Sequence, residues 1–338
     1  MTFRVWRLKK IRRLVFLEVY ILGMKRIHNY LDNVKEKESL ARHTTFRIGG
    51  DAEFFYEVSN PLDLLHAIRT VSFLGMPYEI LAGGSNVLVS DNGFSGLIIK
   101  ISNGKFSLDG SVVEVDAGVS LASLISKTAS EGLSGLEWAA GIPGTIGGAV
   151  FGNAGSFGLS ISNVIDSVDI YNPNNDEVMT LSNKDCDFDY RNSLFKKENL
   201  VILKCRLSLS KANPVDIAKT ISGNLQHKRE IHPSGYLSAG CVFKNIDKKS
   251  IKSTDEKFLR EMARFEKIPV GLLIQEAGFK GYNIGDAMVS DKHANFVVNK
   301  GSACAEQVVC LINKIKNKVE NQSGVVLEEE IRYIGFNN

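Results

Sequence analysis

The sequence predicts an α+β protein built of three consecutive parts, and three features of the chain support this prediction. From about residue 37, strand-like runs of alternating apolar residues are interleaved with segments of helical periodicity. Two glycine-rich stretches interrupt these segments, and a polar junction lies near residues 211–215. Mixed strand and helix signals divided in this way are typical of α+β architecture.

The first part, residues 37–101, begins with a predicted strand over 52–59. A helix follows, with Pro61 at its start, apolar residues along one face and Gly75 as its stop. Short apolar runs then predict three further strands: YEIL, VLVS and GLIIKI.

The second part, residues 102–213, opens with the strand-like SVVEVDAG and the helical SLASLISKTASEGL. It contains the longer glycine-rich stretch and ends in three predicted strands: 163–171, 177–181 and 200–209.

The third part, residues 214–338, starts with a predicted helix around 215–229. A second helix, PVGLLIQEAG, has proline first and glycine last. A long amphipathic helix over 303–320 is predicted to be capped by Ser302. Apolar runs predict strands at 241–245, 294–299 and 325–335.

Residues 1–36 are predicted to form an N-terminal extension. RVWRLKKIRR is basic, and the apolar run that follows is interrupted by Glu18 and is too short to span a bilayer. We favour an extension outside the fold, preceding a start near Met24. A basic amphipathic helix on a membrane surface is the alternative.

Composition narrows the class of protein. The chain has 338 residues, 44% of them hydrophobic and 23% charged, which is typical of a soluble globular protein. A net charge of +3 without a basic stripe gives no indication of nucleic-acid binding. The five cysteines show no CxxC motif and no metal-site spacing, so we expect no metal site, no disulfide framework and a cytoplasmic protein.

Two glycine-rich stretches, AGGSN (82–86) and AAGIPGTIGGA (139–149), could hold a phosphate. Glycines let backbone N–H groups approach an anion, and Ser85, Asn86 and Thr145 could add donors. The GxGxxG and GxxxxGK[ST] motifs are absent, which disfavours a doubly wound dinucleotide domain or a P-loop. Tight turns between buried elements are the alternative. Two such stretches mixed with large apolar residues favour a long ligand with a diphosphate and a flat aromatic ring.

Seven motifs in order along the chain resemble those of the UDP-N-acetylenolpyruvoylglucosamine reductase family. They run from about residue 39 to 335: TTFRIGG, LAGGSNVLVSD, GLEWAAGIPGTIGGAVFGNAGSFG, YRNSLFK, SAGCVFKN, KGYNIGDAMVSDKHANFVVN and LEEEIRYIG. The resemblance implies two domains that form an FAD-binding module of the vanillyl-alcohol-oxidase type, and a C-terminal α+β substrate-binding domain. Nothing after Cys241 resembles the inserted tyrosine loop of some members, so the shorter class is expected.

The resemblance also implies an enzymatic reaction. NADPH reduces FAD, and flavin N5 then delivers hydride to the enolpyruvyl methylene carbon of UDP-N-acetyl-3-O-(1-carboxyvinyl)-glucosamine, giving UDP-N-acetylmuramate for peptidoglycan synthesis. The expected partners are therefore NADPH and the UDP-sugar, and a monomer or weak dimer is expected. Another FAD-dependent oxidoreductase of the same fold, acting on a different sugar or alcohol, is the alternative; a non-catalytic interaction protein is a third.

The family motifs imply cofactor contacts at nine residues: Gly83, Gly84, Ser85, Asn86, Gly141, Gly144, Thr145, Gly147 and Gly148. Bulk at the glycines is expected to displace the cofactor. Substrate contacts are implied at Tyr190, Lys244 and Asn245, and either Lys228 or Arg229 is expected to meet the diphosphate, with Arg229 preferred.

Three residues are implied to be catalytic. Arg191 matches the arginine that grips the substrate carboxylate; without the resemblance it reads as a surface residue. Glu330 is implied to act beside it, with a raised pKa or a partner such as Arg332 or Lys244, whereas periodicity alone favours a solvated strand edge.

Cys241 stands where the best-known members carry a serine proton donor. A thiol, with an ordinary pKa of about 8.5, is a stronger acid than an alcohol, so proton donation is plausible chemistry here. A packing cysteine, with protonation by water, is the alternative.

Overall fold

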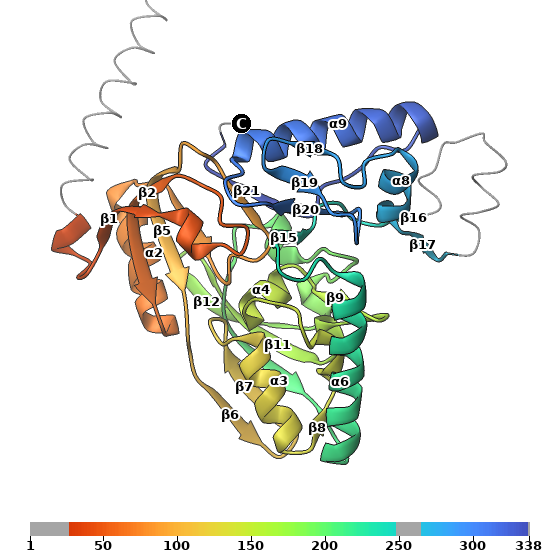
Figure 1. Ribbon diagram of the computed structural model, residues 1–338. Helices are drawn as coiled ribbons and strands as arrows, with labels where there is room; N and C mark the ends of the chain where they lie inside the picture. The colour runs from red at the N-terminus through yellow and green to blue at the C-terminus, as the bar shows by residue number, and fades with distance from the viewer. Residues whose placement is uncertain (1–26, 248–264, 337–338) are drawn as a thin grey trace, which may run out of the picture.

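The computed structural model describes residues 27–247 and 265–336, and Figure 1 shows their arrangement. Most strands belong to three sheets of four or five strands, and helices pack on each of them. The predicted α+β class is confirmed. Residues 1–26, most of the predicted extension over 1–36, lie outside the described ranges.

The first sheet has the order β1-β2-β5-β3, in which only the β1–β2 pair is antiparallel. Helix α2 follows β2 and covers this sheet, as predicted: Asn60 caps its first turn, Pro61 begins it, and Gly75 ends it with φ of 62°. Ile27 and Leu31 are buried in the core beneath α2, so the folded chain starts earlier than the predicted boundary at residue 37. The bounds are β1 Lys35–Ser39, β2 Asp51–Val58, α2 Pro61–Leu74, β3 Tyr78–Leu81 and β5 Phe94–Ile101.

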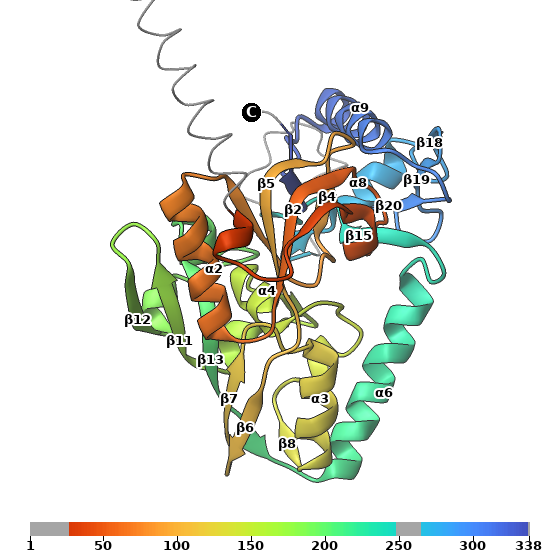
Figure 2. The same ribbon diagram turned by 90° about the vertical axis from the view of Figure 1, so that its left-hand side faces the viewer.

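The second sheet is antiparallel throughout, in the order β12-β11-β13-β7-β6. Helices α3 and α6 lie side by side next to it (Figure 2), and the short helix α4 packs against β13 and β7. The bounds are β6 Phe106–Asp109, β7 Val112–Asp116, α3 Leu121–Ser130, α4 Ile146–Phe151, β11 Ile165–Asn172, β12 Glu177–Ser182, α5 Leu194–Lys197, β13 Val201–Ser208 and α6 Pro214–Ile231.

The third sheet has the order β15-β20-β19-β18 and packs with α8 and α9 around a core that also includes Phe46, Ile48 and Leu88 of the first part. The bounds are β15 Leu237–Cys241, α8 Val270–Glu276, β18 Asn283–Ile284, β19 Ala287–Val289, β20 Phe296–Asn299 and α9 Ala305–Ser323. Shorter pieces are β8 Leu133–Ser134, β9 Gly155–Ser156, β10 Leu159–Ser160, β14 Ser210–Lys211, β16 Ile246–Asp247 and β17 Lys267–Ile268, and the short 3₁₀ turns are Ile27–Asn29, Leu40–His43, Glu137–Ala139, Ile161–Asn163 and Lys184–Cys186.

Two contacts join the end of the chain to its first part. Strand β21, Arg332–Ile334, pairs in parallel with β4, Val87–Val89, directly after the first glycine stretch. The carboxylate of Asp91, just beyond β4, accepts from the backbone N–H groups of Ala305 (2.8 Å) and Glu306 (3.0 Å). Because these donors lie in the first turn of α9, Asp91 satisfies groups that the helix itself leaves unpaired.

Three sequence predictions of local structure were wrong in detail. The N-cap of α9 is Cys304, not Ser302, since Asp91 supplies the capping carboxylate from elsewhere in the chain. The strand predicted at 241–245 is instead β15, which ends at Cys241. Of the strand predicted over 325–335, only Arg332–Ile334 is regular, because β4 offers a short edge for pairing.

Candidate active site

A cavity of about 360 Å³ lies where the three sheets meet, within the size range of small-molecule sites. Its wall combines segments far apart in the sequence: 80–87, 142–156, 200–202 and 239–241. Backbone and apolar side chains form most of this wall, and the charged lining residues are Arg191, Lys196, Lys228, Glu330 and Arg332.

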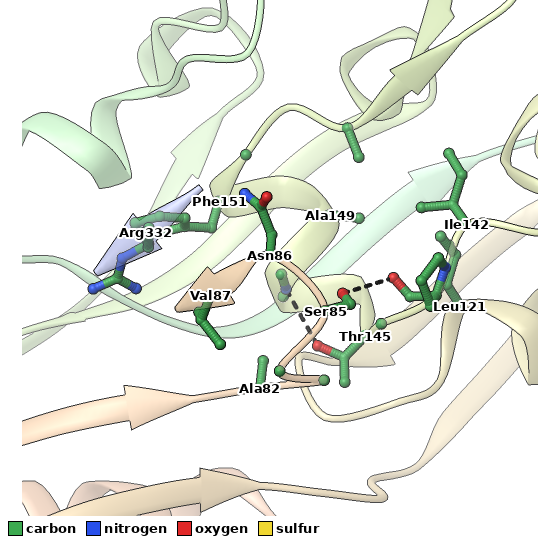
Figure 3. Close-up of a pocket in the computed structure, with 18 of the residues that line it drawn as sticks. Ala82, Ser85, Asn86, Val87, Leu121, Ile142, Thr145, Ala149, Phe151 and Arg332 are labelled. Carbon is green, nitrogen blue, oxygen red and sulfur yellow. Dashed lines mark hydrogen bonds between the residues drawn. The ribbon is translucent and has the colours of Figure 1, made fainter. Parts of the chain in front are cut away.

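The two glycine stretches lie against each other along this wall (Figure 3). Ser85 donates from Oγ to the carbonyl of Pro143 at 3.0 Å, which ties the first stretch to the second. Thr145 caps α4 by accepting from the N–H of Gly148 at 3.2 Å. Asn86 donates from Nδ2 to the carbonyl of Glu330 at 3.1 Å, so the first stretch also positions the C-terminal end of the chain.

The glycines in these stretches serve different purposes, which corrects the expectation that bulk at each would displace a ligand. A Cβ on Gly83 would lie 2.5 Å from the Cα of Gly144, and one on Gly147 would lie 2.7 Å from the Cβ of Ala117. Here the missing side chain lets two parts of the protein touch. At Gly148 a Cβ would have no neighbour closer than 3.6 Å, and this position opens into the cavity.

Arg191 reaches the cavity from a tight turn. Asp189 and Asn192 exchange two backbone hydrogen bonds of 3.1 Å, which leaves Tyr190 and Arg191 as the two central residues. Arg191 has φ of 52°, a left-handed conformation that is unfavourable for a residue with a Cβ. Strained backbone of this kind is concentrated at functional sites.

Arg191 and Glu330 form a partly buried ion pair at the cavity. Arg191 Nε lies 2.8 Å from Glu330 Oε1, and the side chains are 24% and 17% exposed. Among the described residues, Nε has no hydrogen-bond partner of good geometry, whereas Nη2 donates to the carbonyl of Gly155 at 2.9 Å. The guanidinium is therefore oriented by contacts with two segments: Glu330, near the end of the chain, and Gly155, in strand β9.

Burial raises the pKa of the Glu330 carboxyl group, and the positive charges of Arg191 and Lys196 oppose that rise. The direction is the one expected from the sequence. The two suggested partners are engaged elsewhere: Arg332 pairs with Glu79 at 3.1 Å, and Lys244 pairs with Glu328.

Cys241 lies in the cavity wall at the end of β15. Gly240, with φ of 82°, precedes it, and the pairing of β15 with β20 shifts register between Ser238 and Cys241. Burial raises the pKa of the thiol to about 12, with a further rise from Glu330 and an opposing effect from Arg191. Although part of the residue faces the cavity, its thiol is therefore protonated at neutral pH.

Tyr190, Lys244 and Asn245 lie beside the cavity and do not line it. The hydroxyl of Tyr190 accepts from the N–H of Asn245 at 3.3 Å, and its ring has Lys267 Nζ 4.4 Å from its centroid. Asn245 Oδ1 accepts from the N–H of Val270 at 3.2 Å, at the start of α8. These contacts join the Arg191 turn to the third part of the chain, at Asn245, β17 and the start of α8.

Of the two candidates on α6, Lys228 lines the cavity and Arg229 is exposed outside it. Lys228 Nζ donates to the carbonyls of Ala140 (2.7 Å) and Trp138 (3.3 Å), and burial lowers its pKa to about 8. Gly141 also lies outside the lining, next to the Lys228 side chain. Sequence reasoning gave no role to Lys196, a lining residue within the motif YRNSLFK, although a charged residue so close to Arg191 in the sequence could have signalled it.

Comparison with known proteins gives two family matches. Residues 52–182 match the family described as FAD binding domain, and residues 232–334 match the C-terminal domain of UDP-N-acetylenolpyruvoylglucosamine reductase. Two curated reductases of that name are each 36% identical: one from Halalkalibacterium halodurans, over 89% of this chain and 94% of its own length, and one from Caldicellulosiruptor saccharolyticus, over 93% and 94%. The chain belongs to the UDP-N-acetylenolpyruvoylglucosamine reductase family.

The fold agrees with this family membership. The crystal structure of UDP-N-acetylenolpyruvylglucosamine reductase (MurB) from Thermus caldophilus matches with a TM-score of 0.71 and 29% sequence identity, over 89% of this chain and 98% of that chain. The chain is therefore an oxidoreductase of this family, with an FAD-binding module and a C-terminal domain of the reductase type.

The cavity fits an FAD cofactor. Side-chain-poor backbone from two stretches forms one wall, with Gly148 among its residues, and apolar residues such as Ile142 and Phe151 form others (Figure 3). Lys228 can present a positive charge to a phosphate group.

Within residues 27–247 and 265–336, no helix has both the length and the apolar character needed to cross a bilayer.

Proposed function

We propose that this protein catalyses the NADPH-dependent reduction of UDP-N-acetyl-3-O-(1-carboxyvinyl)-glucosamine to UDP-N-acetylmuramate, a step of peptidoglycan precursor synthesis. One observation carries the proposal: a guanidinium, a carboxyl group with a raised pKa and a protonated thiol converge on a cavity lined by the two glycine stretches. The names of the relatives support the same reaction.

FAD, when bound, would supply the redox chemistry, the transfer of hydride from NADPH to the methylene carbon of the enolpyruvyl group. The side-chain-poor walls formed by residues 82–86 and 142–149 would hold it. The protein must then bind the substrate carboxylate, stabilise the negative charge that develops beside it and deliver one proton.

Arg191 is proposed to bind the enolpyruvyl carboxylate. A guanidinium keeps its charge at every physiological pH and donates two parallel hydrogen bonds to a carboxylate. When the methylene carbon gains hydride, negative charge moves to the neighbouring carbon and its carboxylate. A cation already fixed at that position stabilises the transition state more than the ground state.

Cys241 is proposed to deliver the proton. Its S–H bond breaks as the proton moves to the carbon that bears the negative charge, and the thiolate left behind regains a proton from solvent. The raised pKa keeps the thiol protonated before the substrate arrives. The charge developing on the substrate supplies a strong base only when transfer is needed.

Glu330 is proposed to orient Arg191 and to balance part of the positive charge at the site. Its raised pKa lets it hold a proton once a second carboxylate, that of the substrate, binds nearby. Neighbouring carboxylates repel unless one is protonated or paired, and Glu330 can do either.

The nucleotide end of the substrate is proposed to extend past Tyr190, Lys244 and Asn245. Arg229 stays a candidate for the diphosphate, but the placement of Lys228 in the cavity wall supports Lys228 more strongly. We further propose that the protein is of the shorter class without the tyrosine-loop insertion, that its parts divide near residues 101 and 213, and that it is a cytoplasmic monomer or weak dimer.

An absorption spectrum tests the function directly. The purified protein should be yellow, and anaerobic NADPH should bleach the flavin absorbance. Adding the enolpyruvyl sugar nucleotide should restore the colour and produce UDP-N-acetylmuramate. A protein that bleaches with NADPH but never recovers with this substrate, while oxygen reoxidises it, would be a flavoenzyme with a different substrate.

A further inference from the structure

We propose that Lys196 is a positioning residue that holds the Arg191 turn in its active conformation; this inference rests on the function proposed above. Lys196 lies in α5, directly after the turn, and lines the cavity. The catalytic roles proposed above for Arg191, Cys241 and Glu330 do not involve it.

The turn that presents Arg191 needs external support. In a tight turn with left-handed backbone at its third position, glycine or asparagine is the usual occupant, because a Cβ there meets the neighbouring carbonyl. Arg191 occupies this position with φ of 52°. Contacts from the surrounding structure must therefore favour this conformation over an ordinary one.

Lys196 supplies the contact at the strained residue itself. Its Nζ donates a hydrogen bond of 2.8 Å to the backbone carbonyl of Arg191. Burial lowers the pKa of Lys196, as do the nearby cations Lys244, Arg191 and Arg332, while Glu330 opposes the effect. Burying an ammonium group costs free energy unless it is well bonded, so a lysine here indicates that this bond has a purpose.

The other contacts hold the ends of the turn and its other central residue, Tyr190, whose hydroxyl accepts from the N–H of Asn245. Asn153 Nδ2 donates to the carbonyl of Asp189 at 2.8 Å, and Ser193 Oγ donates to the carbonyl of Phe151 at 2.7 Å. The guanidinium of Arg191 is anchored separately, by Gly155 and Glu330. Without Lys196 the peptide after Arg191 could rotate and move the guanidinium away from the substrate carboxylate.

The test measures the two half-reactions of the FAD-loaded enzyme separately. Lys196→Met should slow reoxidation of the reduced flavin by the enolpyruvyl substrate roughly 10- to 100-fold, as expected when a binding group moves by about 1 Å. Flavin reduction by NADPH should change less than about twofold, since NADPH has no carboxylate for Arg191 to bind. Lys196→Arg, which keeps a charged donor, should restore much of the rate.

The adjacent lysine gives a matched control. Lys197 is exposed, pairs with Asp187 and does not line the cavity. Lys197→Met removes one positive charge by the same substitution. Because Lys197 pairs outside the Arg191 turn and does not line the cavity, this variant should leave both half-reactions unchanged. A loss equal to that of Lys196→Met would show that net charge near the site is responsible and would overturn the proposal.

A double-mutant cycle distinguishes positioning from direct contact. If Lys196 acts through Arg191, Lys196→Met should have almost no further effect in an Arg191→Met background. An undiminished effect there would mean that Lys196 contacts the substrate or supports the fold, and the proposal would be wrong.

A crystal structure of FAD-loaded Lys196→Met gives a readout that does not depend on turnover. Arg191 should leave the left-handed region and its guanidinium should move; an unchanged turn would overturn the proposal. If the wild-type enzyme fails to reduce the enolpyruvyl substrate, the proposed function fails, and this structure still decides the role of Lys196.

Discussion

Adding a single methyl group at Gly148 should separate cofactor binding from protein stability. In Gly148→Ala the new Cβ meets Thr145 Oγ1 at 3.6 Å and Ala82 Cβ at 3.8 Å, which are ordinary contact distances. Gly148 lies inside α4, where alanine is favoured over glycine by roughly 0.5–1 kcal/mol. The protein without cofactor should therefore be as stable as wild type or slightly more stable.

Gly148 lines the cavity that we assign to FAD, and so do Thr145 and Ala82, the neighbours of the new methyl group, which should therefore take up cavity space. Forcing an additional methyl group into a well-packed contact costs about 1–3 kcal/mol, so the Kd for FAD should rise roughly 5- to 150-fold. Titration of the cofactor-free protein with FAD, followed by quenching of flavin fluorescence, measures this Kd. Urea unfolding of the same preparation measures stability.

Gly147→Ala is the matched control, one residue away in the same helix. Its Cβ would lie 2.7 Å from the Cβ of Ala117 and 3.0 Å from the Ala117 carbonyl oxygen. The new methyl group would therefore collide with the protein itself and not with a ligand. It should lower stability by about 1–3 kcal/mol without FAD present. Wild-type FAD affinity in Gly148→Ala would refute the assignment of this wall to the cofactor.

Two further predictions follow from the raised pKa values. Because the folded protein holds the proton of Glu330 more tightly than the unfolded chain does, the contribution of Glu330 to wild-type stability should fall as pH rises above about 4.3. Urea unfolding of cofactor-free wild type and Glu330→Gln between roughly pH 4 and pH 7 should therefore show the variant gaining relative stability with pH; a constant difference would contradict a raised pKa. The Cys241 thiol, with its pKa raised to about 12, should react with iodoacetamide far more slowly than exposed Cys310, as mass spectrometry of the two peptides can show. Equal labelling rates at about pH 8 would mean that Cys241 is a readily formed thiolate.

Much of the fold could be read from local pattern. Pro61 and Gly75 mark the ends of α2 because each has a conformational preference that a helix terminus needs. The cap of α9 was missed, since its acceptor, Asp91, is distant in the sequence and is brought to the helix by the packing of β4. Periodicity also overestimated the last strand, whose length is limited by its partner β4.

In the site, as in the fold, some features could be predicted from the sequence and others depend on tertiary contacts. The motifs named Arg191, Cys241 and Glu330, and the structure brings all three to one cavity. Their partners depend on three-dimensional geometry: the pairing of Glu330 with Arg191 has no signal in spacing. The closeness of Lys196 to Arg191 in the sequence marks it as a candidate but does not indicate that its Nζ bonds to the Arg191 carbonyl. The tight approach of Gly83 to Gly144 likewise arises only after two stretches pack together.

The most direct test of the central claim, that Cys241 protonates the substrate at this cavity, is a single turnover under anaerobic conditions. FAD-loaded wild type, Cys241→Ser and Cys241→Ala would each be reduced and then mixed with the enolpyruvyl sugar nucleotide in a stopped-flow instrument. All three should be reduced by NADPH at similar rates. Reoxidation should be fast in wild type, slower in Cys241→Ser and reduced by a factor of roughly 10²–10⁴ in Cys241→Ala. Reoxidation of Cys241→Ala at the wild-type rate would contradict the claim.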